Sequence, residues 1–532
     1  MMKLTRWALT LAFVLTLAFV LTLSGAAEAV IRGGKLTYAR YADSLFLDPV
    51  LNDANVDIWI LTNLYDTVLF PSADGKGVTP GLASAYAVSP DGKTFTLTLR
   101  PGLKFADGSL LTSADVKFSL DRARNPKNGV WSFTLESIDG IEARGPESVV
   151  ISLKQPDPTL AAALATFNTA ILPEKAFNAA PGATDADKAK AFAEKPLGSG
   201  PFMLTEWQRN SFMVLKKNPN YWQNGEDGKP LPYLDEIRFE TIPDDATRIL
   251  KLKAGEVDGA EFIPYARVAE LKSTPGVNME LFPSTRVAYL TLNVRPKLKD
   301  GTDNPLADAR VRQAMNMAVD KDAIIKVVLF GNGKPMRSFM SSSTPMVTGE
   351  APVYPYNLAK AKELLKEAGK ESGIDVSIMA LAGNADDANN LQAIQQMWSQ
   401  VGIRLKIDLM DNATRTARYR AADFQMRTSA WTDDINDPSE ITSYFAYFPT
   451  IESLHGGFRD ARIDELFEKS QHEIDAGKRA GMYKEIQDIY AKAAPIVFLY
   501  ESAYPVALRS HVKGFVQIPL GNNIFAAAYI QK

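Results

Sequence analysis

The chain of 532 residues contains no cysteine and only three histidines. Without cysteine it can form no disulfide bond and no thiolate metal site, and it can carry no lipid on an N-terminal cysteine. The histidines, His455, His472 and His511, are scattered along the chain. No two of them have the spacing of metal ligands. We therefore expect neither a metal site nor a cofactor.

Low-complexity tracts and blocks of like charge are also absent. The formal net charge is −3, and nothing in the charge pattern indicates binding to nucleic acid or to a membrane surface. Nucleotide-binding glycine motifs and the nucleophile elbow of serine hydrolases do not occur in the required context. The sequence Gly331-Asn332-Gly333 is more typical of a turn than of a phosphate cradle. We expect a protein that is not an enzyme and does not itself bind ATP.

The only long apolar run lies at the N-terminus. Lys3 and Arg6 precede an apolar stretch from Trp7 to Leu23, and Ala27-Glu28-Ala29 has the small-x-small pattern of a cleavage site. We predict a secretory signal peptide over residues 1–29, cleaved after Ala29. The alternative is an uncleaved anchor, because the run approaches the roughly 20 residues that span a bilayer. An exported product without an anchor is expected in the periplasm.

The most informative segment runs from Ser89 to Arg122. Phe, Leu and Thr alternate over residues 94–99, which predicts a half-buried strand. The turn signal Asp107-Gly108 follows. Thr112 stands three residues before Asp115, an arrangement typical of a capping box at the start of a helix.

Farther along, helical and strand patterns alternate, which implies an α/β layer. Residues 287–293 and 403–409 are predicted strands, and Asp308 and Asn357 are predicted to cap amphipathic helices. The apolar stretch over residues 495–500 is another predicted strand. The length of the chain indicates two or three domains.

The amino-acid sequences of these segments resemble those of one known protein family. The segment SPDGKTFTLTLRPGLKFADGSLLTSADVKFSLDR closely resembles a signature of the family 5 extracellular solute-binding proteins. Those proteins are the dipeptide- and oligopeptide-binding components of ABC importers. The segments GSGPF, NPNYW, PYLDEIRF, LKAGEVD, DARVRQAMNMAVDKDAI and YNLAKAKELLKEAG stand in the order usual for the family. The resemblance extends from about residue 34 to residue 510.

The resemblance implies an α/β fold, a two-lobed periplasmic binding protein of type II. It is the large, cluster-C-like clamp with an extra small domain inserted in the first lobe. The chain passes between the lobes through two hinge strands, expected near residues 286–291 and 494–498. The expected parts are lobe I over residues 30–70, 197–285 and 495–532, the inserted domain II over 71–196, and lobe III over 286–494.

The predicted ligand site centres on the sequence WTDDINDP, residues 431–438, where three carboxylates lie within five residues. A buried carboxylate that faces a cleft needs a cation, and the α-ammonium of a peptide is one. The resemblance implies that Asp434, three residues after Trp431, holds this ammonium. Alternatively, Asp434 is a turn residue. Asp437 is predicted to be the N-cap of a helix with Pro438 at its first position, and Asp433 is expected to be solvated.

The resemblance implies further ligand contacts. The backbone around Trp431 pairs with an extended peptide as an added strand in the family. The Trp431 ring either stacks on the ligand or fills the core. The first strand leads to the opposite wall of the cleft, and the first hinge strand borders it. Since Tyr and Trp are often buried without any ligand, a core role is the alternative for the aromatic candidates. Besides Asp434 and Trp431, the candidates are Ala430, Thr432, Tyr41, Asp43, Tyr289 and Asn293.

The sequence departs from the peptide-binding pattern at one position. Some oligopeptide binders have an arginine three residues before the tryptophan, where this chain has Thr428. Arg427 is on the opposite face of the predicted strand. The partner of a ligand carboxylate therefore stays open. The basic run of Arg415, Arg418 and Arg420 is expected to be a solvated helix face.

We predict a periplasmic substrate-binding protein of an ABC transporter. It captures a short peptide or another amino-bearing solute by hinge closure and delivers it, as a monomer, to inner-membrane permease subunits. The first alternative is the same scaffold with an opine, an oligosaccharide or a metal chelate as its solute. More remote alternatives are a chaperone-like holder of unfolded chains and an exported hydrolase that uses two of Asp433, Asp434 and Asp437.

Overall fold

The local signals of residues 89–122 form the elements that they predict. The computed structural model describes residues 30–52, 54–129, 131–383 and 385–531, so the predicted signal peptide lies outside the described residues. Strand β5 (Thr94–Leu99) has the predicted alternating burial. Helix α3 (Ser113–Ala123) starts with the predicted capping box, in which Asp115 accepts from the Thr112 N–H at 2.9 Å.

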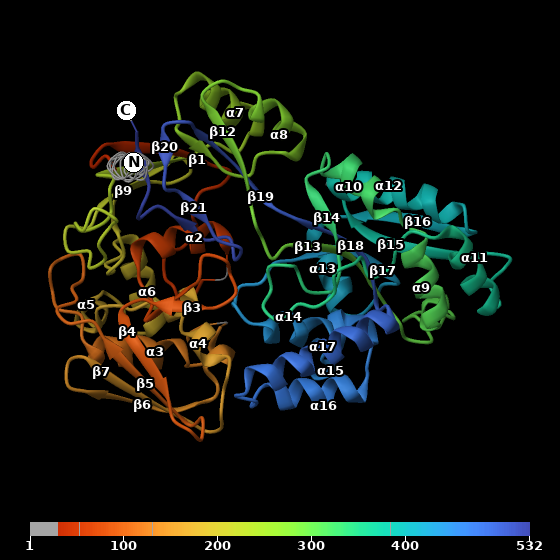
Figure 1. The fold of residues 1–532 in the computed structure, drawn as a ribbon, viewed down its shortest axis with the longest axis horizontal. Coiled ribbons are helices and arrows are strands. Elements are labelled where there is room, and N and C mark those ends of the chain that lie inside the picture. The colour runs from red at the N-terminus through yellow and green to blue at the C-terminus, as the bar shows by residue number, and fades with distance from the viewer. Residues whose placement is uncertain (1–29, 53, 130, 384, 532) are drawn as a thin grey trace, which may run out of the picture.

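A seven-stranded sheet forms lobe I and joins distant parts of the chain (Figure 1). Its strand order is β12-β19-β11-β1-β10-β9-β8, and β1 lies parallel to β10 and β11. Helices α2 (Asn55–Leu64), α7 (Asp245–Ala254) and α8 (Tyr265–Lys272) belong to this lobe. The strands are β1 (Lys35–Arg40), β8 (Phe202–Gln208), β9 (Phe212–Lys217), β10 (Glu236–Thr241), β11 (Gly259–Ala260), β12 (Val277–Phe282) and β19 (Tyr504–Arg509).

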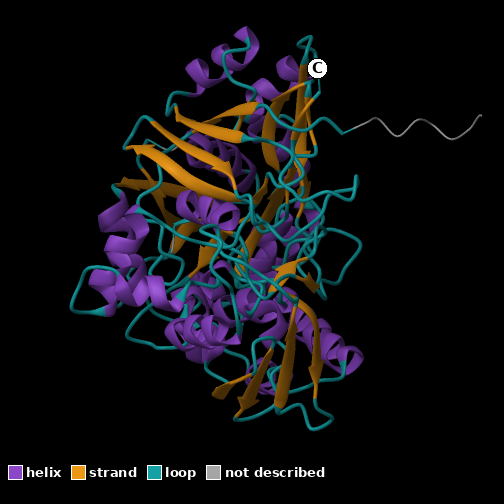
Figure 2. Ribbon diagram, turned by 90° about the vertical axis from the view of Figure 1, so that its left-hand side faces the viewer, coloured by secondary structure: helices purple, strands orange, loops and turns teal. Residues whose placement is uncertain are grey.

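A four-stranded antiparallel sheet, in the order β4-β5-β7-β6, lies within the range predicted for domain II. Figure 2 shows it at the lower end of the molecule, below the large sheet. The division from lobe I is gradual, because Phe177 and Phe192 pack into the core of lobe I. The other elements are β2 (Leu69–Pro71), β3 (Val78–Pro80), β4 (Ala83–Val88), β6 (Ile138–Arg144), β7 (Ser148–Leu153), α4 (Leu160–Ala163), α5 (Glu174–Ala179) and α6 (Asp185–Glu194).

A six-stranded mixed sheet in the order β14-β18-β13-β17-β15-β16 forms lobe III. Its strands are β13 (Val287–Leu292), β14 (Gly333–Pro335), β15 (Ile374–Leu381), β16 (Ile403–Met410), β17 (Met426–Trp431) and β18 (Ile496–Ser502). The helices are α9 (Ala309–Met317), α10 (Lys321–Val328), α11 (Leu358–Glu367), α12 (Ala385–Ser399), α13 (Asn412–Arg420), α14 (Pro438–Phe445), α15 (Phe448–Ile451), α16 (Ala461–Ser470) and α17 (Ala476–Ala493). Asp308 and Asn357 cap α9 and α11, as predicted.

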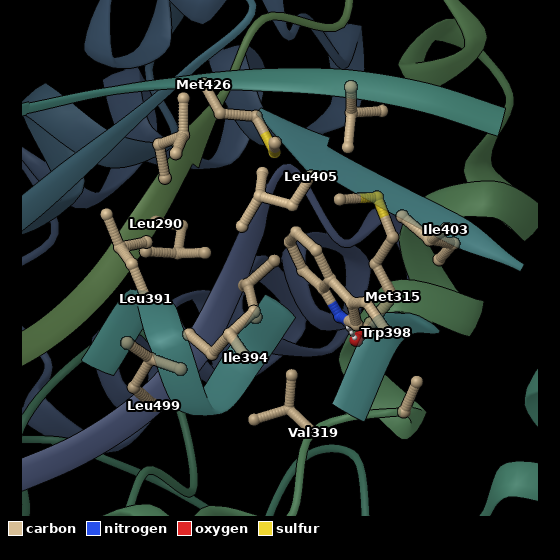
Figure 3. Close-up of a cluster of buried hydrophobic side chains, with 14 of the residues drawn as sticks. Leu290, Met315, Val319, Leu391, Ile394, Trp398, Ile403, Leu405, Met426 and Leu499 are labelled. Atoms are coloured by element: carbon tan, nitrogen blue, oxygen red, sulfur yellow. Dashed lines mark hydrogen bonds between the residues drawn. The ribbon is translucent and has the colours of Figure 1, made fainter. Parts of the chain in front are cut away.

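Trp398 of α12 anchors the core of lobe III (Figure 3). Its ring is fully buried, and its Nε1–H donates to the Met315 carbonyl at 2.9 Å, which satisfies the polar atom that burial would otherwise leave without a partner. Leu290 and Leu499 belong to this core and also line a cavity on the sheet. The packed core therefore holds the strands that form the floor of the cavity.

The chain passes between the two large sheets twice, after β12 and after β18 (Figure 1). The first passage is close to the predicted one. The second differs from the prediction, which placed residues 495–532 in lobe I. Strand β18 pairs with β13 and β14, so the chain stays in lobe III until Ser502 and reaches lobe I at Tyr504. The strand is buried along its whole length, and such an apolar run is equally suited to the interior of either sheet.

None of the helices that the structure describes has the length and apolarity required to span a membrane.

Candidate ligand-binding site

A cavity of about 640 Å³ lies on lobe III, where β13, β17 and β18 meet α13 and α14. Ala430, Trp431 and Tyr289, three of the predicted residues, line it. The core role predicted for Trp431 has support, and its contact with a ligand stays a prediction. Trp431 faces the cavity, and its ring packs 4.8 Å from the ring of Tyr444 and 5.8 Å from that of Phe445. The Tyr289 ring packs 4.8 Å from Phe445, and burial raises the pKa of the Tyr289 hydroxyl.

Strand β17 pairs fully with β13 on one side but only briefly on the other. The single register pair that the described residues form between β15 and β17 is Met379 with Arg427. Beyond it, residues 428–431 line the cavity, and the Thr428 carbonyl accepts from Arg415. A partly open strand edge beside a cavity can accept the main chain of an extended ligand.

Arginines line the cavity, contrary to part of the prediction. Arg415 is only 8% exposed, and its guanidinium donates to the Thr428 carbonyl and, at 3.0 Å, to the Thr428 hydroxyl. Burial, with the nearby charge of Arg427, lowers its pKa. Arg418 does lie on a solvated face, as predicted, and it pairs with Asp423 at 3.0 Å. Arg415 is wrongly predicted because burial of one position on a polar helix depends on the strand packed against it.

Asp433 is fully buried, so the expectation that it is solvated is wrong. Its carboxylate accepts from the Thr344 hydroxyl at 2.6 Å and from Trp431 Nε1 at 2.8 Å. Its backbone N–H donates to the Thr285 hydroxyl at 2.8 Å. Burial raises the pKa of this carboxyl to about 7. These donors hold Asp433 in place and fix the Trp431 indole.

Asp434 is in a different situation. Its backbone N–H donates to Glu440 Oε2 at 2.9 Å, and burial raises the pKa of its carboxyl to about 7. Within the described part of the chain, no group donates a hydrogen bond to the Asp434 carboxylate. The carboxyl of Glu440 is also buried, and its pKa is raised by burial and by the charges of Asp434 and Asp433. Asp434 is therefore a half-buried acid that accepts no hydrogen bond from the described residues, and it lies outside the cavity lining.

Asp437 is the N-cap of α14, as predicted, with Pro438 at the first helical position. It accepts from the Ser439 N–H at 2.8 Å. Both of its oxygens also accept from Arg479 of α17, each at 2.7 Å. This buried bidentate pair gives Asp437 a structural role.

The remaining predicted residues lie outside the cavity lining. Asn293 is 1% exposed and donates to the Phe424 carbonyl at 2.9 Å, so its amide holds the end of β13 rather than facing a ligand. Thr432 is half-buried beside Tyr504 of lobe I. Asp43 accepts from Trp207 Nε1 at 3.1 Å and from the Asn210 N–H at 2.8 Å. These bonds fix loops of lobe I.

Tyr41 also belongs to lobe I and is half-buried. Its ring packs 4.6 Å from that of Phe262, which in turn stacks on Trp59 at 5.3 Å. Tyr41 is thus part of an aromatic cluster on lobe I.

Two contacts that sequence reasoning missed join lobe III to the opposite side. The Asn436 amide donates to the Gly77 carbonyl, and His472 Nδ1 lies 3.0 Å from the Pro156 carbonyl. Asn436 lies within the WTDDINDP segment, but no local pattern marks an asparagine whose partner is 359 residues away. The segment that carries the acids therefore lies at the junction of the two halves of the molecule.

The described residues contain no arrangement of side chains suited to metal ligation. No group of three or more His, Asp and Glu side chains there is placed to hold a metal ion.

Comparisons with known proteins agree with this geometry. A family model described as bacterial extracellular solute-binding proteins, family 5 (middle), matches residues 77–450. The chain is 31% identical over 447 residues to the glutathione-binding protein GsiB of Salmonella typhi, which covers 82% of this chain and 83% of that protein.

Two solved structures that contain bound ligands are also similar to this chain. The ABC transporter-associated periplasmic binding protein DppA from Helicobacter pylori, in complex with the peptide STSA, is 26% identical with a TM-score of 0.76, covering 94% of this chain and 99% of that one. The binding protein AgaA from A. tumefacien R10, in complex with agropinic acid, is 28% identical with a TM-score of 0.74 and the same coverage. These are transport binding proteins rather than enzymes. The chain belongs to the family 5 bacterial extracellular solute-binding proteins, the periplasmic solute-binding components of ABC importers.

Proposed function

We propose that this protein captures a short peptide or another amino-bearing solute in the cavity beside β17 and delivers it to inner-membrane permease subunits. The carrying observation is the Asp434 carboxylate, which is half-buried, has a pKa raised by burial and receives no hydrogen bond from the described residues. An ammonium group supplies both the charge and the donors that this acid lacks. A charge-assisted hydrogen bond of this kind contributes about 1.5–3 kcal/mol.

The strand edge supports a peptide in particular. Residues 428–431 of β17 line the cavity, and the aromatic residues Trp431 and Tyr289 are part of this lining. Main-chain pairing holds a peptide without selecting its side chains. The names of GsiB and of the DppA complex, which refer to glutathione and to a peptide, point to the same class of ligand.

Closure follows from the two passages between the lobes. Contacts such as that of Asn436 with Gly77 exist only when lobe III meets the other half. A ligand held by both sides stabilises this closed arrangement, and the permease then recognises it. We assign lobe I to residues 30–70, 197–285 and 503–532, domain II to 71–196 and lobe III to 286–502.

The cellular form is part of the proposal. The N-terminal pattern supports cleavage after Ala29 and export without a lipid anchor, because the chain has no cysteine. We propose that the exported protein acts as a monomer, since one chain supplies the cavity and both lobes. Neither a metal nor a cofactor is required for capture.

A non-peptide solute is the second candidate. The likeness to AgaA, whose structure holds agropinic acid, together with the arginines of the cavity, favours an opine over an oligosaccharide or a metal chelate. A hydrolase is not supported, since Asp433 and Asp437 are already engaged by neutral donors and by Arg479.

Calorimetric titration of the exported protein with glutathione and with Ala-Ala-Ala tests the proposal. We expect Asp434→Asn to weaken binding of the better probe by about 2–5 kcal/mol. The matched control is Asp139→Asn, which alters an exposed acid on β6 and should leave affinity unchanged. Equal affinity of the Asp434→Asn variant and the wild type would refute the role of Asp434 in binding an ammonium.

A further inference from the structure

We infer that the cavity on lobe III is an anion-recognition subsite, and that the solute is an amino compound whose opposite end carries at least two negative charges. This inference rests on the proposed function and deepens it by naming the class of solute. An acidic short peptide and an amino-bearing dicarboxylate both belong to this class.

The charge of the lining carries the inference. Four arginines line the cavity, whereas Asp387 is the one acidic residue among its described lining residues. Asp387 already accepts from the Thr428 hydroxyl at 2.7 Å. None of the four arginines forms an ion pair within the described residues. They are Arg286, Arg415, Arg420 and Arg427.

Burial of these guanidinium groups favours the binding of an anion. Arg415 and Arg427 each keep a buried Nε–H without an acceptor, and the charge of Arg427 lowers the pKa of Arg415. Arg427 lies 4.0 Å over the ring of Tyr419, which fixes the plane of its guanidinium. The charges of a buried and a half-buried guanidinium repel each other, and the nearby charge of Asp387 offsets this only in part for Arg415. An added anion relieves the repulsion, and planar guanidiniums bind carboxylates in bidentate fashion.

The arginines line the cavity, whereas Asp434, the proposed amine site, lies outside its lining, three residues after Trp431. Trp431 and Tyr444 line the cavity. Asp434 is near Tyr444, since burial, the charge of Glu440 and the charge of Asp434 together raise the pKa of the Tyr444 hydroxyl. Arg415 and Tyr419 come from α13, and Asp387 comes from α12. A solute with an ammonium at one end and carboxylates at the other is complementary to this separation of charge.

The cavity arginines stand at other positions than the arginine of the oligopeptide binders. Oligopeptide binders with an arginine three residues before the tryptophan would place it at Thr428, which here is 4% exposed and bonded to Arg415 and Asp387. Arg427, at the neighbouring position of β17, and Arg415, on α13, line the cavity instead.

The test compares probes of matched shape by calorimetry at low salt. Ala-Ala-Glu and Ala-Ala-Gln differ in one negative charge, and glutarate carries two carboxylates without an amine. We expect the wild type to bind Ala-Ala-Glu at least about tenfold more tightly than Ala-Ala-Gln. Arg427→Gln should abolish this preference, and Arg427→Lys should restore only part of it, because lysine lacks the planar fork.

Arg418→Gln is the matched control, since Arg418 lies on the same helix as Arg415 but pairs with Asp423 outside the cavity. It should keep the full preference. If Arg427→Gln does not fold, Arg420→Gln takes its place, because Arg420 lines the cavity from an exposed position.

The outcomes separate the two proposals. Equal wild-type affinity for Ala-Ala-Glu and Ala-Ala-Gln would overturn the anion subsite and leave the proposed function standing. Binding of glutarate that depends on Arg427, without binding of either peptide, would support the subsite and overturn the amine site. Absence of binding by all three probes would overturn both.

Discussion

At the scale of single residues, two adjacent acids at the junction of the lobes differ in their hydrogen bonds. Asp433 has donors from Thr344 and Trp431, whereas Asp434 has none in the described part of the chain. Burial raises the pKa of both carboxyls to about 7. Asp433 fixes the Trp431 indole, and under the proposed function Asp434 receives the cation. An acid poised in this way costs stability in the absence of ligand.

This cost predicts that the Asp434→Asn variant is more stable than the wild type by an amount that depends on pH. The folded-state pKa of about 7 lies above the ordinary value of 3.8. Between these values the folded protein holds a proton that the unfolded chain releases, so the stability contributed by this group falls as pH rises. We expect Asp434→Asn to raise the free energy of unfolding relative to the wild type by about 1–3 kcal/mol more at pH 8 than at pH 5.

Urea unfolding of the ligand-free protein at the two pH values measures this gain. Asp139→Asn, which alters an exposed acid, should show no difference between pH 5 and pH 8. An Asp434→Asn variant with the same stability difference from wild type at both values would contradict the raised pKa.

Sequence reasoning at this scale succeeded where the signal is local. Asp437 followed by Pro438 predicts an N-cap, and the structure has one. Asp433 and Arg415 were predicted to be solvated and are buried. Their burial depends on Thr344, Thr428 and other groups brought together by the fold, and no pattern within the segment records it.

At the scale of elements, one buried ion pair ties α14 to α17. Arg479 lies on the first turns of α17 and holds both oxygens of Asp437 at 2.7 Å. The pair fixes the start of α14 and, through it, the loop that carries Asp433 and Asp434. Removing one member leaves an uncompensated buried charge.

We predict that Asp437→Ala lowers the free energy of unfolding by about 3–5 kcal/mol, because Arg479 then keeps its buried charge without a partner. Urea unfolding monitored by tryptophan fluorescence provides the measurement. The control is Glu485→Ala, which breaks the exposed pair of Arg462 with Glu485 between α16 and α17 and should cost about 1 kcal/mol or less. Similar losses for the two variants would show that the Asp437 pair is not specially stabilising.

Elements were predictable to the extent that their signals are contained within them. The Thr112 capping box and the alternation of β5 were correct in detail. Strand β18 was predicted as a strand but joined to the wrong sheet, because its continuous apolar run does not specify its partners. Strand pairing between distant segments is decided by the whole fold.

At the scale of the whole molecule, the resemblance rather than local physics predicted a two-lobed clamp. Six segments in family order carried that prediction, and the family comparison confirms it. The contacts that join the halves could not be predicted, since Asn436 and Gly77 lie 359 residues apart in the sequence. Such contacts form only after each lobe has folded, so they leave no periodic pattern in the sequence.

The Asn436 contact gives a prediction about closure. Asn436 does not line the cavity, so its replacement should act on the equilibrium between open and closed forms rather than on the ligand. One hydrogen bond contributes about 1 kcal/mol, so Asn436→Ala should raise the dissociation rate of glutathione, used as the probe, about fivefold. Stopped-flow fluorescence measures this rate. The control Asn220→Ala removes a 3.1 Å bond to the Ala106 carbonyl that does not involve lobe III, and it should leave the rate unchanged. Equal dissociation rates for Asn436→Ala and the wild type would mean that this contact does not hold the lobes together, and closure would then depend on the ligand and on other contacts such as that of His472 with Pro156.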